Sequence, residues 1–467
     1  MKFDILCVFA LSLLSASLAA VVNEEVTRTV DASTAIVKVT TDIKVEGSGK
    51  EYPFYVPNSQ ASHVAFISAA AKGKKGKGKG QGYKVSAPVI DGDEKGYTKY
   101  TIFVGESSPT IRVKMILTDL LVPYPAEISQ SDNQFVRFVD SHYFYSPYST
   151  TTQKLVVKLA SSTVESYTKH APHVQKGSTL TFGPYKEIEP YSVSPLTVHY
   201  LNNKPFSKLT TTEIDIEVSH WGESSVEEIH ELKHTGARLS GGFSRLDYQM
   251  KQQASTPSFN SLVAHLPTQA HSIYYRDQIG NISTSDMRLV DNGLELDIAT
   301  RFPIFGGWKT QFYLGYSIPT ANILSVDSDT GRYKVKFDLF PVFEDVWVGA
   351  LTLKLALPEG ASDVKVHLPE GAGEWEQSWS RRFTYLDSKL NGGRPVLILK
   401  GNNLVEDLES VAEITYTFNK ARMLVEPFML FLSFFALFAL ATIVSRMSAV
   451  GASEVSTSGG DDDKEGK

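Results

Sequence analysis

Residues 213–219 read Glu-Ile-Asp-Ile-Glu-Val-Ser, so an apolar residue occupies every second position. Successive side chains of a β-strand point to opposite faces of its sheet, and the apolar residues at 214, 216 and 218 would therefore share one face. Strict alternation of this kind is typical of an antiparallel strand that buries one face and exposes the other. We expect residues 213–219 to form such a strand.

The same alternation recurs along the chain, at residues 35–39, 100–104, 154–159, 333–339, 364–368 and 413–418. Turn-forming Gly, Pro, Asn and Asp separate these short segments, as in β-sandwiches. Roughly 400 residues lie between the two apolar segments described next, which is enough for two domains. We predict a mostly β protein with two tandem β-sandwich-like domains, divided after Gly222 into a first β-rich domain at 21–222 and a second at 223–426.

The N-terminus has the three parts of a secretory signal peptide. Lys2 supplies the basic start, residues 5–18 form an apolar run, and small residues follow. The run is shorter than the ~20 residues that span a bilayer, which disfavours the alternative of an uncleaved anchor. We predict a signal peptide at 1–20, with cleavage near Ala19 or Ala20.

A second apolar segment covers residues 427–445 without a charge, between Glu426 and Arg446. At 1.5 Å per residue this segment would be about 28 Å long as a helix, which matches the hydrocarbon core of a bilayer. We predict a single C-terminal transmembrane helix. With a cleaved signal peptide, the protein is expected to be a single-pass type I membrane protein whose β-domains are lumenal and whose short acidic tail, 446–467, is cytosolic.

The composition excludes several function classes. The chain has 46 Lys and Arg against 52 Asp and Glu, a net charge of −6, which argues against binding of nucleic acid. Its one cysteine, Cys7, lies in the predicted signal peptide, so the mature chain would contain none. A disulfide framework, a cysteine-ligated metal site and a thiol nucleophile are therefore not expected. We predict no cofactor.

Two short motifs suggest modification or metal binding. Asn281-Ile282-Ser283 is an N-glycosylation sequon, so Asn281 is expected on a surface loop. Residues 230–234 read His-Glu-Leu-Lys-His, the HExxH pattern in which, on a helix, two histidines bind zinc and the glutamate acts as general base.

The surroundings of the HExxH pattern argue against a metal site. Thr235-Gly236 follows at once, which makes a continuing helix doubtful, and no third ligand stands at the spacing that zinc peptidases use. We expect no metal ligand and no catalytic residue at His230, Glu231 and His234. A membrane-tethered zinc peptidase using these three residues is the alternative function.

The aromatic stretch Tyr143-Phe144-Tyr145-Ser146-Pro147-Tyr148 is denser in aromatic residues than most of the chain. Such a run is expected to pack in a core or at a domain seam, and the alternative is a surface that contacts peptide or glycan.

Long irregular stretches of this sequence resemble the ribophorin I family. The resemblance is carried by residues 122–128, 135–138, 143–148, 151–153, 220–222, 234–239, 243–248, 274–283, 301–308 and the apolar span. It implies a subunit of the oligosaccharyltransferase complex, resident in the endoplasmic reticulum membrane, with two lumenal β-domains. It also implies that Asn281 is glycosylated.

The resemblance implies that the chemistry of protein N-glycosylation belongs to a partner. The multispanning catalytic subunit of the complex carries a Trp-Trp-Asp signature, whereas no two of the five tryptophans here are adjacent. The expected partners are the other oligosaccharyltransferase subunits, nascent polypeptide acceptors and the membrane. Vertebrate relatives carry a long cytosolic extension implicated in meeting the ribosome; the tail here stops at Lys467, so the resemblance does not carry that role over to this chain.

Overall fold

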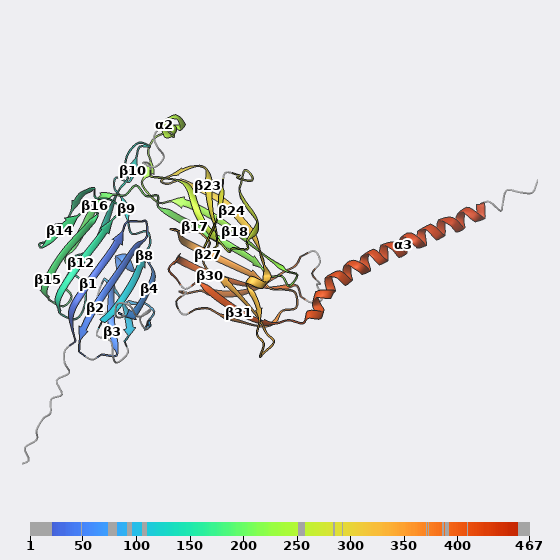
Figure 1. Cartoon of the computed structure of the whole chain (residues 1–467), viewed down its shortest axis with the longest axis horizontal. Coiled ribbons are helices and arrows are strands. Elements are labelled where there is room, and N and C mark those ends of the chain that lie inside the picture. The colour runs from blue at the N-terminus through green and yellow to red at the C-terminus, as the bar shows by residue number, and fades with distance from the viewer. Residues whose placement is uncertain are drawn as a thin grey trace, which may run out of the picture.

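The protein is mostly β, with one long C-terminal helix, as predicted (Figure 1). The computed structural model describes residues 21–455, except for 48, 73–81, 91–95, 105–109, 251–256, 284, 292, 370, 372, 385–386, 388–391 and 409. The predicted signal peptide and the tail beyond residue 455 lie outside the described residues. Within them, two sheet-built units follow one another along the chain, and the helix α3 (Val425–Val455) extends away from the second unit (Figure 1).

The first unit is built from two sheets. The larger sheet has the strand order β14 (His173–Lys176), β15 (Thr179–Ile188), β12 (Thr150–Leu159), β1 (Val22–Ala32), β2 (Val37–Glu46), β8 (Thr110–Leu117), β4 (Val64–Ala71), β5 (Gly82–Val85), β7 (Tyr97–Phe103) and β3 (Glu51–Pro57), with β6 (Val89–Ile90) beside β7. The smaller sheet has the order β13 (Val164–Tyr167), β16 (Pro195–Leu201), β11 (Phe135–Ser141) and β9 (Val122–Pro123).

Alternation places the core of the first unit. Val26 and Val30 on β1 and Leu155 and Val157 on the parallel strand β12 are fully buried, while Thr27, Thr29 and Val156 on the other face are only half-buried. Aromatic side chains from the other strands fill the space around them. Burial of one face therefore fixes the register of these strands, because a slip by one residue would expose every apolar side chain.

The second unit contains three sheets. Its main sheet has the order β21 (His271–Asp277), β24 (Lys309–Pro319), β18 (Glu223–His234), β17 (Ser207–Glu217), β27 (Trp347–Ala356), β30 (Arg394–Val405) and β29 (Glu376–Arg382). Two smaller sheets have the orders β20 (Ser258–Leu266), β23 (Gly293–Phe305), β22 (Asp286–Val290), and β25 (Leu324–Val326), β26 (Tyr333–Asp338), β31 (Val411–Thr417), β28 (Ser362–His367).

The strand predicted at residues 213–219 overlaps the end of β17, which stops at Glu217. Ile214, Ile216 and Val218 are buried in the second core, as their alternation requires. The other alternating segments also overlap strands, namely β2, β7, β12, β26, β28 and β31. The mostly β fold class is thus confirmed by the elements from which it was inferred.

The sheets divide the chain earlier than the predicted boundary after Gly222. β17 pairs antiparallel with β18 and parallel with β27, so β17 belongs to the second unit. The predicted boundary falls in the turn between β17 and β18, and the sheets separate instead between β16 and β17. A turn and a linker have the same polar, glycine-containing composition, and only the pairing distinguishes them.

Backbone and side-chain hydrogen bonds join the two units along a seam. Gln134 of the first unit is fully buried. Its Oε1 accepts a 2.8 Å hydrogen bond from the N–H of Ala237, and its Nε2 donates to the carbonyl oxygen of Asn202 at 2.8 Å. The short strands β10 (Glu127–Ile128) and β19 (Arg238–Leu239) pair in parallel across the same seam.

Apolar contacts reinforce the seam at a second place. Ile36 and Ile116 belong to the first unit by sequence but pack into the core of the second. Close to them Lys38 forms an ion pair of 2.7 Å with Asp407. The two units therefore share buried surface as well as a covalent connection.

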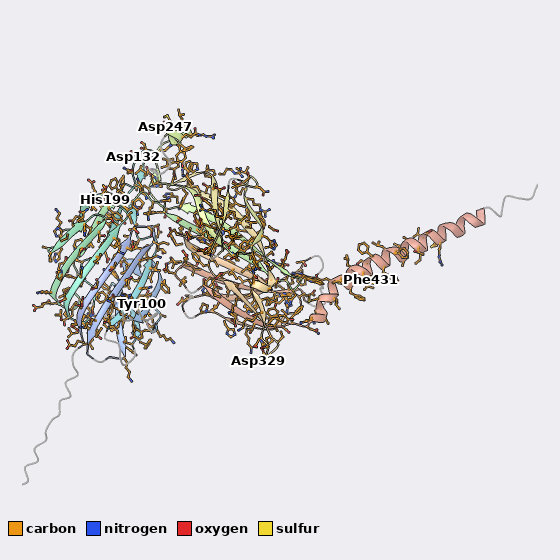
Figure 2. All side chains as sticks on the ribbon, viewed as in Figure 1. Tyr100, Asp132, His199, Asp247, Asp329 and Phe431 are labelled. Atoms are coloured by element: carbon orange, nitrogen blue, oxygen red, sulfur yellow. The ribbon has the colours of Figure 1, made fainter. Side chains whose placement is uncertain are left out.

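The helix α3 is long and apolar enough to cross a membrane. Its large apolar side chains lack cover, and Phe438 is 73% exposed. Figure 2 shows Phe431 on the helix, which extends away from both β units. Exposure of so many large apolar groups to water is unfavourable, so the helix requires an apolar environment. We conclude that the protein is anchored in a membrane.

Candidate functional site

The membrane-proximal junction connects the second unit to α3 without a long linker. β31 ends at Thr417, the 3-10 helix η4 (Lys420–Leu424) follows, and α3 begins at Val425. The Asn419 side chain accepts a 3.0 Å hydrogen bond from the N–H of Ala421 and so caps η4. Because few residues separate strand from helix, the sheet and the membrane anchor are closely coupled.

Arg394 at the start of β30 is the centre of this junction. Its guanidinium contacts three carboxylates: Glu217 at 2.5 Å, Asp387 at 3.0 Å and Glu426 at 3.4 Å. A guanidinium has five N–H donors in a fixed plane, so one arginine can serve several acceptors. Burial would raise the pKa of Asp387, but hydrogen bonds from the backbone of Thr384 and from Arg394 outweigh it and lower that pKa.

An exposed tryptophan lies at the same end of the second unit. His220 and Trp221 occupy the turn between β17 and β18. The His220 ring stacks on Phe418, with ring centroids 4.3 Å apart, and its Nε2 lies 2.9 Å from the Tyr416 hydroxyl. Trp221, the next residue in the turn, is 58% exposed. Tryptophan is enriched at membrane–water interfaces, so the turn is suited to contact with the lipid headgroups.

The HExxH segment lies on a strand, which rules out the zinc-peptidase arrangement. His230, Glu231 and His234 belong to β18. Four residues of a strand cover about 13 Å, whereas two nitrogens on one zinc ion must each lie about 2 Å from it. Glu231 points to the opposite face, where it pairs with Lys309 at 3.0 Å. The alternative function that used these three residues therefore has no structural basis.

Both histidines are buried structural residues. His230 Nε2 lies 3.0 Å from Oε2 of Glu228, and its Nδ1 lies 3.2 Å from the Thr212 hydroxyl. His234 Nδ1 accepts a 2.9 Å hydrogen bond from the N–H of Gly236, and burial lowers the pKa of His234 to about 4. Among the described residues no cluster of three or more metal-binding side chains is found.

The sequon asparagine is exposed. Asn281 lies in the turn after β21, where the N–H of Ile282 donates to the carbonyl of Tyr275 at 2.9 Å. Asp277 organises the turn, because its carboxylate accepts hydrogen bonds from the N–H groups of Ile279 and Gly280. The position meets the geometric requirement for glycosylation, and the modification itself stays a prediction.

The aromatic run packs largely inside the first unit. Phe144 is buried and contacts Phe54, and Tyr145 stacks on Tyr97 with ring centroids 3.6 Å apart. Most side chains of the run are buried or half-buried. Core packing, the expected interpretation, is therefore confirmed for this stretch.

These features define a class of protein: a membrane-anchored chain that carries two consecutive sheet-built units on a C-terminal apolar helix. Comparison with known proteins then gives the family. The Ribophorin I family matches residues 21–445, and the chain belongs to this family.

Relatives from plants and a nematode support the assignment. Dolichyl-diphosphooligosaccharide–protein glycosyltransferase subunit 1B of Arabidopsis thaliana is 37% identical over 430 residues, 90% of each chain. Subunit 1A of the same plant is 35% identical over 439 residues, 91% of this chain and 70% of its own. Subunit 1 of Caenorhabditis elegans is 38% identical over 449 residues, 94% of this chain and 75% of its own.

A solved structure with partial likeness is the native leukotriene A4 hydrolase of Saccharomyces cerevisiae. It is 14% identical over 45% of this chain and 29% of its own, with a TM-score of 0.25. A score that low supports no inference.

Proposed function

We propose that the chain is a non-catalytic subunit of the oligosaccharyltransferase complex in the endoplasmic reticulum membrane. In this role it supports transfer of a preformed oligosaccharide from dolichol diphosphate to Asn-x-Ser/Thr of nascent polypeptides, while a multispanning partner performs the chemistry. The observation that carries the proposal is the 35–38% identity, over 90–94% of this chain, to proteins named as subunit 1 of that enzyme.

The proposed topology is type I, with both β units in the lumen. Both units precede α3, so one crossing of the bilayer leaves them on the same side. An exposed Asn281 is consistent with that side being the compartment in which sequons are modified.

The proposed role of the chain is to support assembly of the complex and to present the acceptor polypeptide. Arg394 couples the second unit to the first turn of α3, and the buried seam couples the first unit to the second. A chain coupled in this way can hold the β units at a defined place above the membrane. The uncovered apolar surface of α3 is available to helices of a partner, and packing between helices is a usual basis of assembly in membranes.

Affinity purification in mild detergent tests the proposal. A C-terminally tagged chain should co-elute with the multispanning catalytic subunit, and depletion of the chain should leave sequons of reporter glycoproteins unoccupied. A variant in which residues 427–445 are replaced by an unrelated apolar span of equal length should remain in the membrane with less co-eluting partner. Elution of the chain alone, together with unchanged sequon occupancy after depletion, would contradict the proposal.

A further inference from the structure

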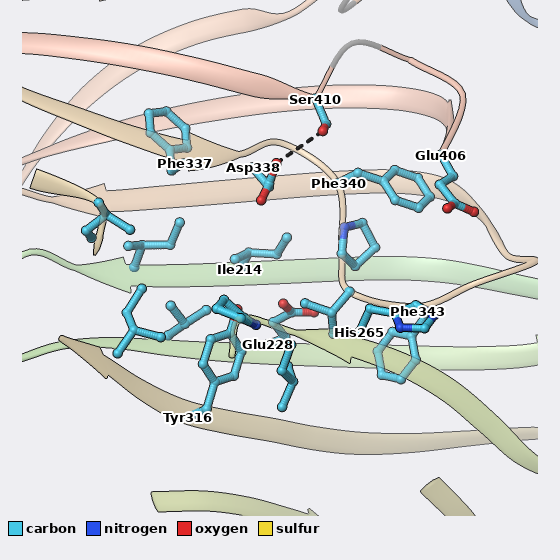
Figure 3. A pocket seen from close by; sticks show the side chains of 18 of the residues that line it. Ile214, Glu228, His265, Tyr316, Phe337, Asp338, Phe340, Phe343, Glu406 and Ser410 are labelled. Atoms are coloured by element: carbon cyan, nitrogen blue, oxygen red, sulfur yellow. Dashed lines mark hydrogen bonds between the residues drawn. The ribbon is translucent and has the colours of Figure 1, made fainter. Parts of the chain in front are cut away.

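A cavity of about 400 Å³ lies inside the second unit, between the main sheet and the segment that follows β26. In Figure 3, Glu228, Tyr316, His265 and Phe343 lie on one side of it, and Phe337, Asp338, Phe340, Glu406 and Ser410 lie on the other. The volume falls within the range of small-molecule sites, roughly 300–1,000 Å³. None of these residues takes part in the junction or the sequon described above.

A buried carboxylate lies on the floor of this cavity. Glu228 on β18 is 2% exposed and is opposite Ile214 on β17 and Leu314 on β24. Among the described residues only His230 bonds to its side chain, through Oε2. The other oxygen, Oε1, is therefore free for a ligand in the cavity, and a buried carboxylate is costly unless a donor satisfies it.

The remaining charges around the cavity are mainly acidic. The lining contains four carboxylates: Glu228, Asp338, Glu344 and Glu406. Its basic side chains are Lys336 and His265, and His265 pairs with Glu344. Burial raises the pKa of Glu406, and the nearby carboxylates of Glu344 and Asp407 raise it further. The walls between these charges are apolar, with Ile214, Val226 and Phe340 among them.

We propose that this cavity binds an alkylammonium group on an apolar stem, with the cation bonded to Oε1 of Glu228. One free carboxylate oxygen suits the compact ammonium group, whereas a guanidinium binds best to two oxygens at once. The apolar walls would cover the stem while Glu406 and Asp338 attract the cation at the entrance. A lysine side chain of a polypeptide and a free amphiphilic amine share this chemistry.

Calorimetry with a matched pair of probes tests the site on the full-length chain in zwitterionic nanodiscs. The amine 4-phenylbutylamine should bind about tenfold or more tightly than the neutral 4-phenylbutanol, because a charged hydrogen bond distinguishes them. Glu228→Gln should remove that difference. Glu406→Gln, at the entrance, should weaken amine binding without disturbing the buried His230. Glu231→Gln, on the opposite face of β18, is the matched control and should bind as the parent does.

Competition distinguishes the two sources of the amine. If the peptide acetyl-Phe-Lys-Phe-amide displaces 4-phenylbutylamine and its glutamine analogue does not, the site accepts lysine side chains of polypeptides. If neither peptide competes, the site accepts free amines, and the proposal stands in that form. Equal binding of the amine and the alcohol, or unchanged amine binding in folded Glu228→Gln and Glu406→Gln, would overturn it. None of these results depends on the proposed role in glycosylation.

Discussion

Arg394 joins the sheet of the second unit to the membrane helix through Glu426. Its Nη2 lies 3.4 Å from the Oε1 of Glu426, which is in the first turn of α3. A carboxylate at this end of a helix also interacts favourably with the helix dipole. The same guanidinium holds Glu217 on β17, so one side chain links two strands of a sheet to the start of the anchor.

Replacing Arg394 should destabilise the second unit. The Arg394 side chain is only 15% exposed and the side chain of Asp387 is fully covered, so Arg394→Ala leaves Asp387 without its cation. We expect a loss of about 1–3 kcal/mol in the free energy of unfolding, the range for charged groups that lose a buried partner. Arg394→Lys should recover part of the loss.

Urea denaturation of the full-length chain in detergent measures the Arg394 effect. Lys309→Ala is the control, because Lys309 is 68% exposed in its pair with Glu231 and such pairs contribute about 1 kcal/mol or less. Equal stability of Arg394→Ala and Lys309→Ala would show that the junction adds nothing.

Stability of the second unit should fall as the pH drops from about 6.5 to about 4. Burial lowers the pKa of His234 to about 4 from its ordinary value of 6.5. Between these values the unfolded chain binds a proton that the folded chain does not, so the contribution is complete above about pH 6.5 and is lost on acidification. The pKa shift of His234 alone limits this contribution to the free energy of unfolding to at most about 3 kcal/mol.

His234→Asn isolates this effect. The Asn Oδ1 can accept the hydrogen bond that Nδ1 of His234 accepts from Gly236, and it does not titrate in this range. The difference in thermal midpoint between parent and variant should therefore shrink from pH 7 to pH 4, with His271→Asn as the exposed control. A constant difference across that range would assign His234 no role in the pH dependence.

Zinc should not bind stoichiometrically at the HExxH segment. His230 and His234 lie four residues apart on β18, too far to share an ion. His230 Nε2 is bonded to Glu228, and Nδ1 of His234 accepts from the N–H of Gly236. Elemental analysis of the purified chain after incubation with zinc and desalting should find far less than one ion per chain. Stoichiometric zinc in the parent that disappears in His230→Ala would contradict the structure.

Replacing the buried Gln134 at the seam should lower the free energy of unfolding more than replacing an exposed glutamine. Gln134→Ala removes the partners of two buried backbone groups, the N–H of Ala237 and the carbonyl of Asn202. We expect a loss of about 2 kcal/mol, typical of a buried group left without a hydrogen bond. Gln175→Ala is the control, because its 3.3 Å bond to the Ser162 carbonyl lies on the surface. Differential scanning calorimetry distinguishes the two variants.

The strands and the anchor could be predicted because each is determined by the pattern of residues close together in the sequence. The alternation at 213–219 follows from burial of one face, and the span at 427–445 follows from its uninterrupted apolar composition. The HExxH motif misleads because it is defined by helical geometry. In the same stretch every second side chain is buried, and this two-residue period indicates a strand. The buried residues are Val226, Glu228, His230, Leu232 and His234.

Contacts between distant segments could not be predicted in the same way. Arg394 lies 32 residues from Glu426 and 177 from Glu217, and no local pattern relates them. The same holds for the adjacent residues Glu227 and Glu228, whose side chains lie on opposite faces of β18. Glu227 is on the half-exposed face, and Glu228 lines the cavity. Only the pairing of β17, β18 and β24 identifies which carboxylate is buried.

Asn281 should carry one N-linked glycan if the β units face the lumen as proposed. The side chain is exposed in a turn that Asp277 and Arg301 organise, with Arg301 Nη2 donating to Asp277 Oδ1 at 2.7 Å. The parent should therefore show a single mobility step with endoglycosidase H in gel electrophoresis. Asn281→Gln and Ser283→Ala should each abolish the step, and Ser283→Thr should keep it, because threonine also completes the sequon. An endoglycosidase-insensitive parent whose tagged C-terminus is protected in sealed microsomes would place the β units on the opposite side of the membrane.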